Sequence, residues 1–295
     1  MANVDSECSG LGPDAHCAPS KQHNASHNNA GLGLRNEVAV KKVMPKPTTL
    51  RLVRATDASR DVRVLVLEVV SNEVFSFQPG QWMALRRNEG TDAYLSIASA
   101  PDQLGPNCIE LAVRAAVDRD HAWLRDLGPG SLVQAWGPSG TFTRNSSHLP
   151  CAAFIGTGTG LAPLRSMFHA EYRLHSMFVA PVVLLAGHRN EESTLWRREF
   201  ELLAQADPHF DYWLTLSNPS SAWRGRTGRV QAYVQAVVER IAPQEYYLCG
   251  QPGMVEEVRA LLTGAYGIAP ECIHTEQMSA QTGMVSDRAG QQGEF

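Results

Sequence analysis

The segment that most constrains the fold lies in the middle of the chain, where residues 151–167 read CAAFIGTGTGLAPLRSM. A short apolar run is followed by a glycine-rich loop and then by apolar residues at helical spacing. Such a strand, loop and helix bring unpaired backbone amides and the positive end of a helix dipole to one place. The segment therefore predicts an anion site that suits a pyrophosphate, although a plain tight turn in an α/β domain has the same pattern.

The sequence beyond this loop alternates between strand and helix patterns. Apolar runs predict strands at residues 151–155, 182–186, 212–216, 246–249 and 272–274. Amphipathic stretches predict helices at residues 161–175, 192–206, 230–241 and 255–263. This alternation is typical of a doubly wound parallel sheet covered on both faces. We therefore predict an α/β domain over residues 148–278.

The sequence before the loop has the pattern of an antiparallel barrel. Its short apolar or alternating runs read LRLVRAT, VRVLVLEVV, QWMALR, YLSIAS, CIELAVRA and SLVQAWG. Turn residues separate these runs at intervals that suit a small Greek-key β-barrel. We predict this barrel over residues 47–147, so the chain is expected to be an α+β protein of two domains.

The two ends of the chain lack apolar periodicity. Residues 1–46 are rich in Ser, Asn, Gly and Ala and predict a disordered arm, and residues 279–295 predict a polar tail. Cys8, Cys17 and nearby histidines could be imagined as a metal cluster, but this composition favours solvated disorder. The six cysteines of the chain include no Cys-x-x-Cys pair, and we predict no metal site.

Composition excludes several classes of function. A formal net charge of −4 argues against a nucleic-acid partner. No apolar run approaches the about 20 residues that span a bilayer, and the N-terminus lacks the features of a secretory signal. Scattered cysteines suit a reduced compartment. We expect a soluble intracellular protein, with the cytoplasm favoured and a plastid or mitochondrion as the alternative.

A series of motifs resembles those of the ferredoxin–NADP reductase family of flavoproteins. In chain order they are FQPGQW, SIASAP, WGPSGTF, GTGTGLAPLRS, LCGQPGMVEEV and IHTE. The resemblance spans residues 48–278 and is strongest to stand-alone plant and algal reductase-like proteins. It implies an NAD(P)H-dependent enzyme in which hydride passes between the nucleotide and a flavin, FAD in preference to FMN. Electrons would then pass to a separate acceptor, such as another redox protein.

The resemblance also implies site residues. Ser96 would hydrogen-bond near flavin N5, Cys249 would pack by the nicotinamide, and Glu276 would relay protons and orient the ring. The implied flavin strand comprises Tyr94, Leu95, Ser96, Ile97, Ala98 and Ser99. The implied dinucleotide contacts are Gly156, Thr157, Gly158, Thr159, Gly160, Ser217, Arg224, Cys249, Gly250 and Met254. As plain alternatives, Cys249 is a small buried hydrophobe, Glu276 a solvated acid and Ser96 an ordinary strand residue.

The flavin half departs from the family pattern at two places. Where the family has Arg-x-Tyr-Ser, residues 93–96 read AYLS, so the phosphate-pairing arginine and the flanking aromatic are missing. Tyr94 lies one residue away from the position of that aromatic, which in a strand is the opposite face. The family's Gly-x-x-Ser loop is replaced by DRDHAWL at residues 118–124. These departures predict weaker flavin binding and favour, as an alternative function, a regulatory nucleotide-binding protein on the reductase scaffold.

The choice between NADH and NADPH depends on the loop after the third parallel strand. Ser217 is followed by Asn218 and Pro219, which carry no charge and favour NADH. Arg224 and two further arginines follow a few residues later, and arginine is well shaped to bind the 2′-phosphate of NADPH. The sequence favours NADH and leaves NADPH as the alternative.

Overall fold

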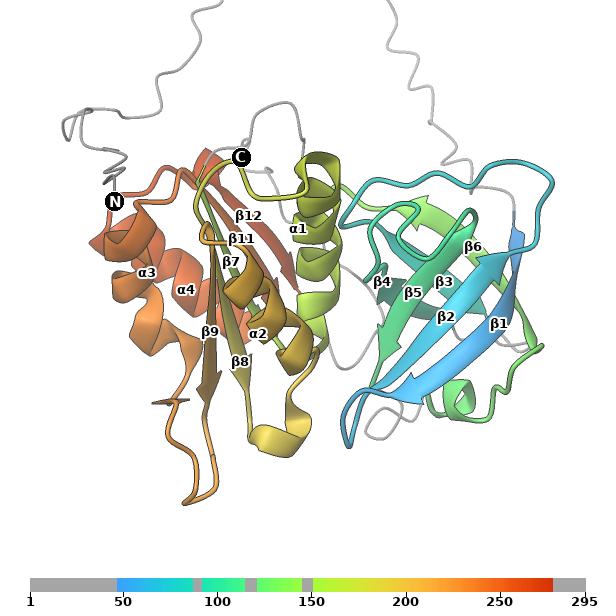
Figure 1. The fold of residues 1–295 in the computed structure, drawn as a ribbon, viewed down its shortest axis with the longest axis horizontal. Coiled ribbons are helices and arrows are strands. Elements are labelled where there is room, and N and C mark those ends of the chain that lie inside the picture. Colours follow the sequence, from blue (N-terminus) through green and yellow to red (C-terminus); the bar gives the residue numbers. More distant parts are fainter. Residues whose placement is uncertain (1–46, 87–91, 115–120, 145–150, 278–295) are drawn as a thin grey trace, which may run out of the picture. The chain divides into compact units, whose positions relative to one another are not determined.

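The computed structural model describes residues 47–86, 92–114, 121–144 and 151–277. These residues form two six-stranded sheets (Figure 1). All strand pairs of the first sheet are antiparallel, and all strand pairs of the second are parallel. The predicted combination of an antiparallel barrel and a doubly wound parallel sheet is confirmed.

The antiparallel sheet closes on itself. Its strands are β1 (Thr48–Asp57), β2 (Arg63–Val69), β3 (Trp82–Arg86), β4 (Asp92–Ser96), β5 (Cys108–Val113) and β6 (Leu132–Ser139), paired in the order β4-β3-β6-β1-β2-β5. An antiparallel bridge between Ile97 and Leu111 joins the two outer strands, so the sheet becomes a barrel. Alternate apolar residues, including Leu52, Leu67 and Leu95, fill its interior.

The parallel sheet has helices on both faces (Figure 1). Its strands are β7 (Ala152–Thr157), β8 (Val182–His188), β9 (Phe210–Leu216), β10 (Arg226–Thr227), β11 (Glu245–Gly250) and β12 (Ile273–Gln277), in the order β10-β9-β8-β7-β11-β12. The helices are α1 (Leu161–His175), α2 (Arg197–Ala206), α3 (Val234–Ile241) and α4 (Pro252–Ala265). Phe154 of β7 packs in the core that α1 and α2 cover, whereas its neighbour Ile155 packs in the core that α3 and α4 cover.

Several element boundaries differ from the sequence prediction. Helix α1 has the predicted bounds, but α2 begins at Arg197 rather than at residue 192. The residues before it form a 3-10 turn, η3 (Glu191–Ser193), in which Asn190 and Ser193 cap each other, and Trp196 has a left-handed conformation with φ of 49°. This local capping competes with the helix and delays its start.

The last strand is longer than its apolar pattern indicates. Strand β12 continues to Gln277 because it pairs along its whole length with β11, and that pairing sets Cys249 beside Glu276. Helix α3 begins later than expected because η4 (Val230–Tyr233) forms a 3-10 turn before it. The other short turns are η1 (Ala122–Arg125), η2 (Gly158–Gly160) and η5 (Pro270–Cys272).

The predicted domain limits, 47–147 and 148–278, remain predictions because the connection at residues 145–150 lies outside the described residues. The arm predicted at 1–46 and the tail predicted at 279–295 lie outside them as well. Across the described parts of residues 47–277, no helix is long and apolar enough to cross a membrane. Within the same residues, no group of three or more His, Cys, Asp or Glu side chains is placed to hold a metal ion.

Candidate functional site

Three side chains that are far apart in the sequence meet at one buried carboxylate. Ser96 ends β4 of the barrel, whereas Cys249 and Glu276 lie side by side on β11 and β12 of the parallel sheet. The Ser96 hydroxyl donates to Glu276 Oε2 at 3.3 Å, and the Cys249 thiol donates to the same oxygen at 3.8 Å. Their exposed fractions are 3% for Ser96 and 0% for the other two. The structure therefore brings together all three residues that the resemblance singled out for chemistry.

The Cys249 thiol is protonated in this environment. Complete burial raises its pKa well above the usual value, and the neighbouring Glu276 raises it further. A thiol of this kind is neither a nucleophile nor a base, because both roles require the thiolate. In this structure Cys249 is therefore a compact, buried hydrogen-bond donor to Glu276.

The glycine loop between β7 and α1 uses its glycines for different reasons. Gly158 has a φ of +57°, and a Cβ added there would meet nothing within 4 Å. Gly160 lies against the end of β11, where an added Cβ would be 2.5 Å from the Cys249 carbonyl oxygen. Gly156 packs under α1, where an added Cβ would be 2.8 Å from Leu164 Cδ1. The loop is thus fixed against β11 and α1, while its backbone at Gly158 stays uncovered.

The residues beside this loop leave a polar group for a ligand. Thr157 Oγ1 is buried and makes no hydrogen bond within the described part of the chain. It lies next to Gly250, which has a φ of +152°, and a Cβ added to that glycine would meet both Thr157 Oγ1 and the Met254 methyl group. Thr159 is half-buried within the loop. An uncovered backbone and an unpartnered buried hydroxyl fit the phosphate and carboxamide groups of a pyridine dinucleotide.

The flavin strand has two different faces. Leu95 and Ile97 point into the barrel core, whereas Tyr94 shares the outer face with Ser96. Trp82 of β3 lies opposite Ser96, and its ring meets the Tyr94 ring edge-on at 5.2 Å. The position of the family's aromatic is thus taken by a core leucine, and Tyr94 is on the opposite face from it, as the strand period predicts. The aromatic pair beside Ser96 can border a flat ring.

The end of this segment contacts helix α1 instead of open space. Ala98 and Ser99 are fully buried, and their carbonyl oxygens accept hydrogen bonds from α1. On the outer face of β3, Arg86 is already held by Asp92 through bonds of 2.6 and 2.8 Å. The described residues of β3 and β4 therefore fit the ring of a flavin better than its phosphates. Residues 118–120 of the unusual loop at 118–124 lie outside the described residues, and its remaining part enters the 3-10 turn η1.

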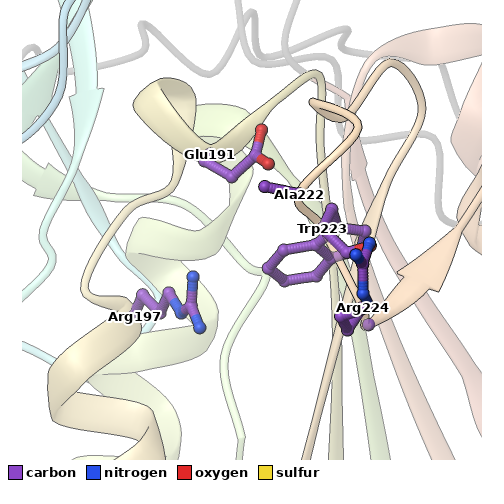
Figure 2. Close-up of a pocket in the computed structure, with 6 residues that line it drawn as sticks. Glu191, Arg197, Ala222, Trp223 and Arg224 are labelled. Atoms are coloured by element: carbon purple, nitrogen blue, oxygen red, sulfur yellow. The ribbon is translucent and has the colours of Figure 1, made fainter.

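A pocket lies beyond the carboxyl ends of β8 and β9. Its volume is about 440 Å³, and it is lined by Glu191, Arg197, Ala222, Trp223, Arg224 and Gly225 (Figure 2). Figure 2 shows the Trp223 ring between the two arginines, and the Arg197 guanidinium lies 5.2 Å from the ring centre. Arg224 donates to the carbonyl oxygen of Ser221 at 2.8 Å. Arg224 therefore lines this pocket, and its contact with the nucleotide stays a prediction.

The other residues of this loop differ in their surroundings. Ser217 is exposed at the end of β9, where its amide donates to the His188 carbonyl oxygen at 3.0 Å. Arg226 lies over the Trp213 ring at 4.3 Å, away from the pocket lining. Glu191 accepts a 2.6 Å bond from the Ser220 hydroxyl, and this bond holds the pKa of Glu191 below its usual value. Glu191 therefore puts a negative charge beside the arginines.

Comparisons with known proteins agree with this geometry. Residues 154–260 match the family model of the oxidoreductase NAD-binding domain. The chain is 36% identical over 246 residues to ferredoxin–NADP reductase B of Sorangium cellulosum, covering 80% of this chain and 99% of that protein. It is 27% identical over 234 residues to the ferredoxin–NAD(P)+ reductase component of the naphthalene 1,2-dioxygenase/salicylate 5-hydroxylase systems of a Ralstonia species, covering 77% and 69%.

Among solved structures, the fold is similar to the CS-b5R domains of human Ncb5or in the NAD+ form. The TM-score is 0.70 at 21% identity, covering 86% of this chain and 77% of that one. A closed barrel with a buried serine, next to a doubly wound sheet with a glycine loop, defines a two-domain flavoprotein reductase. The chain belongs to the ferredoxin–NADP reductase family. It is an NAD(P)H-dependent oxidoreductase that uses FAD and passes electrons to a separate acceptor. The comparisons therefore favour the enzyme over the regulatory alternative.

Proposed function

We propose that Ser96, Cys249 and Glu276 surround the point at which hydride passes between nicotinamide and flavin. The observation that supports this is the shared oxygen: Glu276 Oε2 accepts from a hydroxyl of the barrel and from a thiol of the parallel sheet. The barrel is the element that would hold the flavin, and the parallel sheet is the element that would hold the nucleotide. One carboxylate therefore touches both halves of the enzyme.

Each of the three side chains has its own task in this proposal. A bound flavin supplies the redox chemistry, since its ring can take a hydride from a reduced nicotinamide and release electrons to an acceptor. Glu276 holds the Ser96 hydroxyl in place and can give or take a proton at Ser96 Oγ. Cys249, protonated and buried, keeps water from the floor on which the nicotinamide would pack.

The dinucleotide is proposed to run from this point across the carboxyl edge of the parallel sheet. Its pyrophosphate would lie on the amides of Gly158 and its neighbours, at the start of the 15-residue helix α1. The carboxyl ends of β7, β8 and β9 share one edge because the strands are parallel. The adenosine end would therefore enter the pocket beside Trp223, with Arg224 in its wall and Ser217 at the end of β9.

We propose NADH as the preferred nucleotide. The ionised Glu191 lines the pocket and would repel a 2′-phosphate. Arg197 is held by the Glu201 carboxylate through a 2.7 Å bond. Arg224 is bonded only to backbone carbonyl oxygens among the described residues, so it is the pocket arginine that could bind this phosphate. NADPH is the alternative, since the Sorangium relative carries NADP in its name.

We propose that the acceptor is a separate one-electron carrier protein of the ferredoxin type. The names of the Sorangium and Ralstonia relatives include ferredoxin, and this is the support for the proposal. We also propose an intracellular location, with the cytoplasm favoured, because Cys108 and Cys249 are thiols that suit a reduced compartment. Reduction of a ferredoxin by the purified protein and NADH tests the acceptor, and a rate no higher than that of free flavin contradicts it.

The site itself is tested without any acceptor. Purified protein should show the visible flavin absorption band, and acid release followed by chromatography should identify FAD. NADH added without oxygen should bleach this band in wild type. Ser96→Ala should bleach more slowly, because the hydroxyl beside Glu276 is lost while the strand remains. Equal bleaching rates in the two proteins would contradict the proposed role of this site.

A further inference from the structure

Two adjacent buried residues of helix α1 donate hydrogen bonds to the barrel. Arg165 Nη1 donates to the Ala98 carbonyl oxygen at 2.8 Å, and the Ser166 hydroxyl donates to the Ser99 carbonyl oxygen at 2.7 Å. Arg165 is 5% exposed and Ser166 is 0% exposed. The two carbonyls lie two and three residues beyond Ser96. The helix that begins at the glycine loop is therefore bonded directly to the continuation of the flavin strand.

Arg165 is held on every side of its guanidinium group. Nη1 also donates to Glu110 of β5 at 3.0 Å. Nε and Nη2 donate to the two carboxylate oxygens of Glu199 on α2, at 2.7 and 2.9 Å. The flat face of the group lies 4.9 Å from the centre of the Trp196 ring. A planar, multiply bonded guanidinium of this kind fixes direction as well as distance, which a lysine ammonium cannot do.

A cluster of this composition is a poor source of stability. Burying a charge costs desolvation free energy, and the attraction between the buried charges often only balances this cost. Apolar side chains of similar size would therefore hold the two halves together equally well. Burial raises the pKa of Glu110 and disfavours its charged form. In spite of its burial, the pKa of Glu199 is lowered to about 2 by hydrogen bonds from His169 and Arg165, so the two effects oppose each other. The cluster gives the contact between α1 and the barrel a fixed geometry, and that is where its contribution lies.

The contact between α1 and the barrel also lies close to the candidate site. Arg165 lies five residues after Gly160, which is about 7 Å along a helix. Ala98 lies two residues after Ser96, which is about 7 Å along a strand. Gly160 in turn lies against the Cys249 carbonyl. A small displacement of Arg165 would therefore change the distance between Ser96 and the glycine loop by a similar amount.

We propose that Arg165 and Ser166 are positioning residues, which set the separation between the flavin ring at Ser96 and the nucleotide on the glycine loop. The inference rests on the proposed placement of the two cofactors. Neither residue touches the reacting atoms; both act through the backbone of residues 98–99. A purely structural contact between the two halves is the competing explanation, and it predicts an effect on stability alone.

The test compares Arg165→Lys with Arg173→Met in the full-length holoenzyme. Arg173 lies on the same helix, is exposed, and donates to the Asp102 carbonyl oxygen at 3.3 Å, so it is a matched control contact to the barrel. Flavin content, thermal unfolding, affinity for NAD+ and the rate of flavin bleaching at saturating NADH would be measured. A readout without turnover is the change in the visible flavin spectrum when NAD+ is added to the oxidised protein.

For Arg165→Lys we expect normal flavin content and nearly unchanged NAD+ affinity, with a bleaching rate at saturation that is about 10- to 100-fold lower. The spectral change on NAD+ addition should become smaller, since the nicotinamide no longer lies at the same distance from the flavin. Arg173→Met should match wild type in all of these. The proposal is overturned if Arg165→Lys has a lower unfolding temperature but keeps the wild-type bleaching rate and the wild-type spectral change.

Ser166→Ala provides a second variant should Arg165→Lys fail to fold, because it removes one hydrogen bond without leaving a buried charge unpaired. A lower saturating rate with unchanged NAD+ affinity supports the positioning role, and an unchanged rate overturns it. If wild type itself shows no spectral change with NAD+ or NADP+, the proposed placement of the cofactors fails first. The two failures are thereby distinguished.

Discussion

The nucleotide half and the flavin half of this chain differ in what their sites are made of. The nucleotide site is built from backbone: a left-handed Gly158, and a Gly160 that leaves room for the Cys249 carbonyl. The proposed flavin site would be built from side chains on one face of β4 and β3, where Arg86 is already bound to Asp92. The departures from the family pattern at residues 93–96 and 118–124 both lie in the flavin half.

This difference has a physical reason. A glycine loop works through amides and the helix start, so few substitutions are compatible with it. A flavin can be held by many combinations of rings and donors, so its strand can change as long as one face stays open. We therefore expect normal nucleotide binding, weaker flavin binding, and a shared carboxylate that neither half can lose.

The largest effect is expected at the residue that joins the halves. Glu276→Gln keeps the size of the side chain but removes the charge that holds Ser96 and Cys249. The rate of flavin bleaching at saturating nucleotide should fall about 100-fold or more, since positioned acid–base groups contribute on this scale. Rapid mixing without oxygen measures it. Glu271→Gln, an exposed acid shortly before β12, is the control and should behave as wild type; similar rates in both variants would place the chemistry elsewhere.

The second effect concerns flavin binding by the barrel, which we expect to be weaker than nucleotide binding by the parallel sheet. A missing charge-assisted hydrogen bond costs about 1.5–3 kcal/mol, which is about one to two decades in flavin affinity. The protein should therefore lose flavin on dilution and recover it when FAD is added. Titration of flavin-free protein, followed by fluorescence, gives the dissociation constant. Retention of flavin through prolonged dialysis would show that residues outside β3 and β4 replace the lost phosphate contact.

The third effect is confined to the stronger half. Gly158→Val should raise the apparent KM for the nucleotide about tenfold, because a branched side chain is strained at φ of +57° and projects where the phosphate would lie. The flavin spectrum should not change. Steady-state assays with a dye acceptor measure KM, and the absorption spectrum of the same sample is the internal control. Equal nucleotide affinity in wild type and Gly158→Val would show that the loop is only a turn and does not bind the nucleotide.

The smallest effect is expected at the pocket. We expect a higher kcat/KM for NADH than for NADPH, and little change for NADH in Arg224→Ala, because an exposed charge is worth about 1 kcal/mol or less. Arg226→Ala serves as the control, since Arg226 lies over Trp213 instead of lining the pocket. A tenfold preference for NADPH that Arg224→Ala abolishes would reverse the assignment and identify the phosphate site.

Much of the nucleotide half could be predicted because its signals are local. The glycine loop fixes the start of α1, and the apolar stripe of that helix gives its end. The start of α2 could not be predicted, since the capping of η3 by Asn190 and Ser193 competes with helical periodicity. The length of β12 depends on pairing with β11, which a polar strand end does not show.

The candidate site could be predicted only in part from the sequence, because contacts between elements that are far apart in the chain leave no local signal. Ser96, Cys249 and Glu276 were found through the resemblance, but nothing in the spacing of the three indicates that they meet. The sequence marks Arg165 only as a charged residue in the apolar stripe directly after the glycine loop. Its partners are backbone carbonyls and acids on distant elements, so only the folded chain reveals them.

The bonds from α1 to Ala98 and Ser99 also bear on how such reductases can be recombined. Both acceptors are main-chain carbonyls, which every amino acid supplies, so the barrel surface at this junction can vary in sequence without losing them. Among the described barrel residues, Glu110 is the one whose side chain bonds Arg165. A chimera that joins this nucleotide-binding half to the barrel of a relative therefore needs three things from that barrel: an acid at the position of Glu110, a serine at that of Ser96, and apolar side chains where Val62 and Phe142 pack in the core shared with α1.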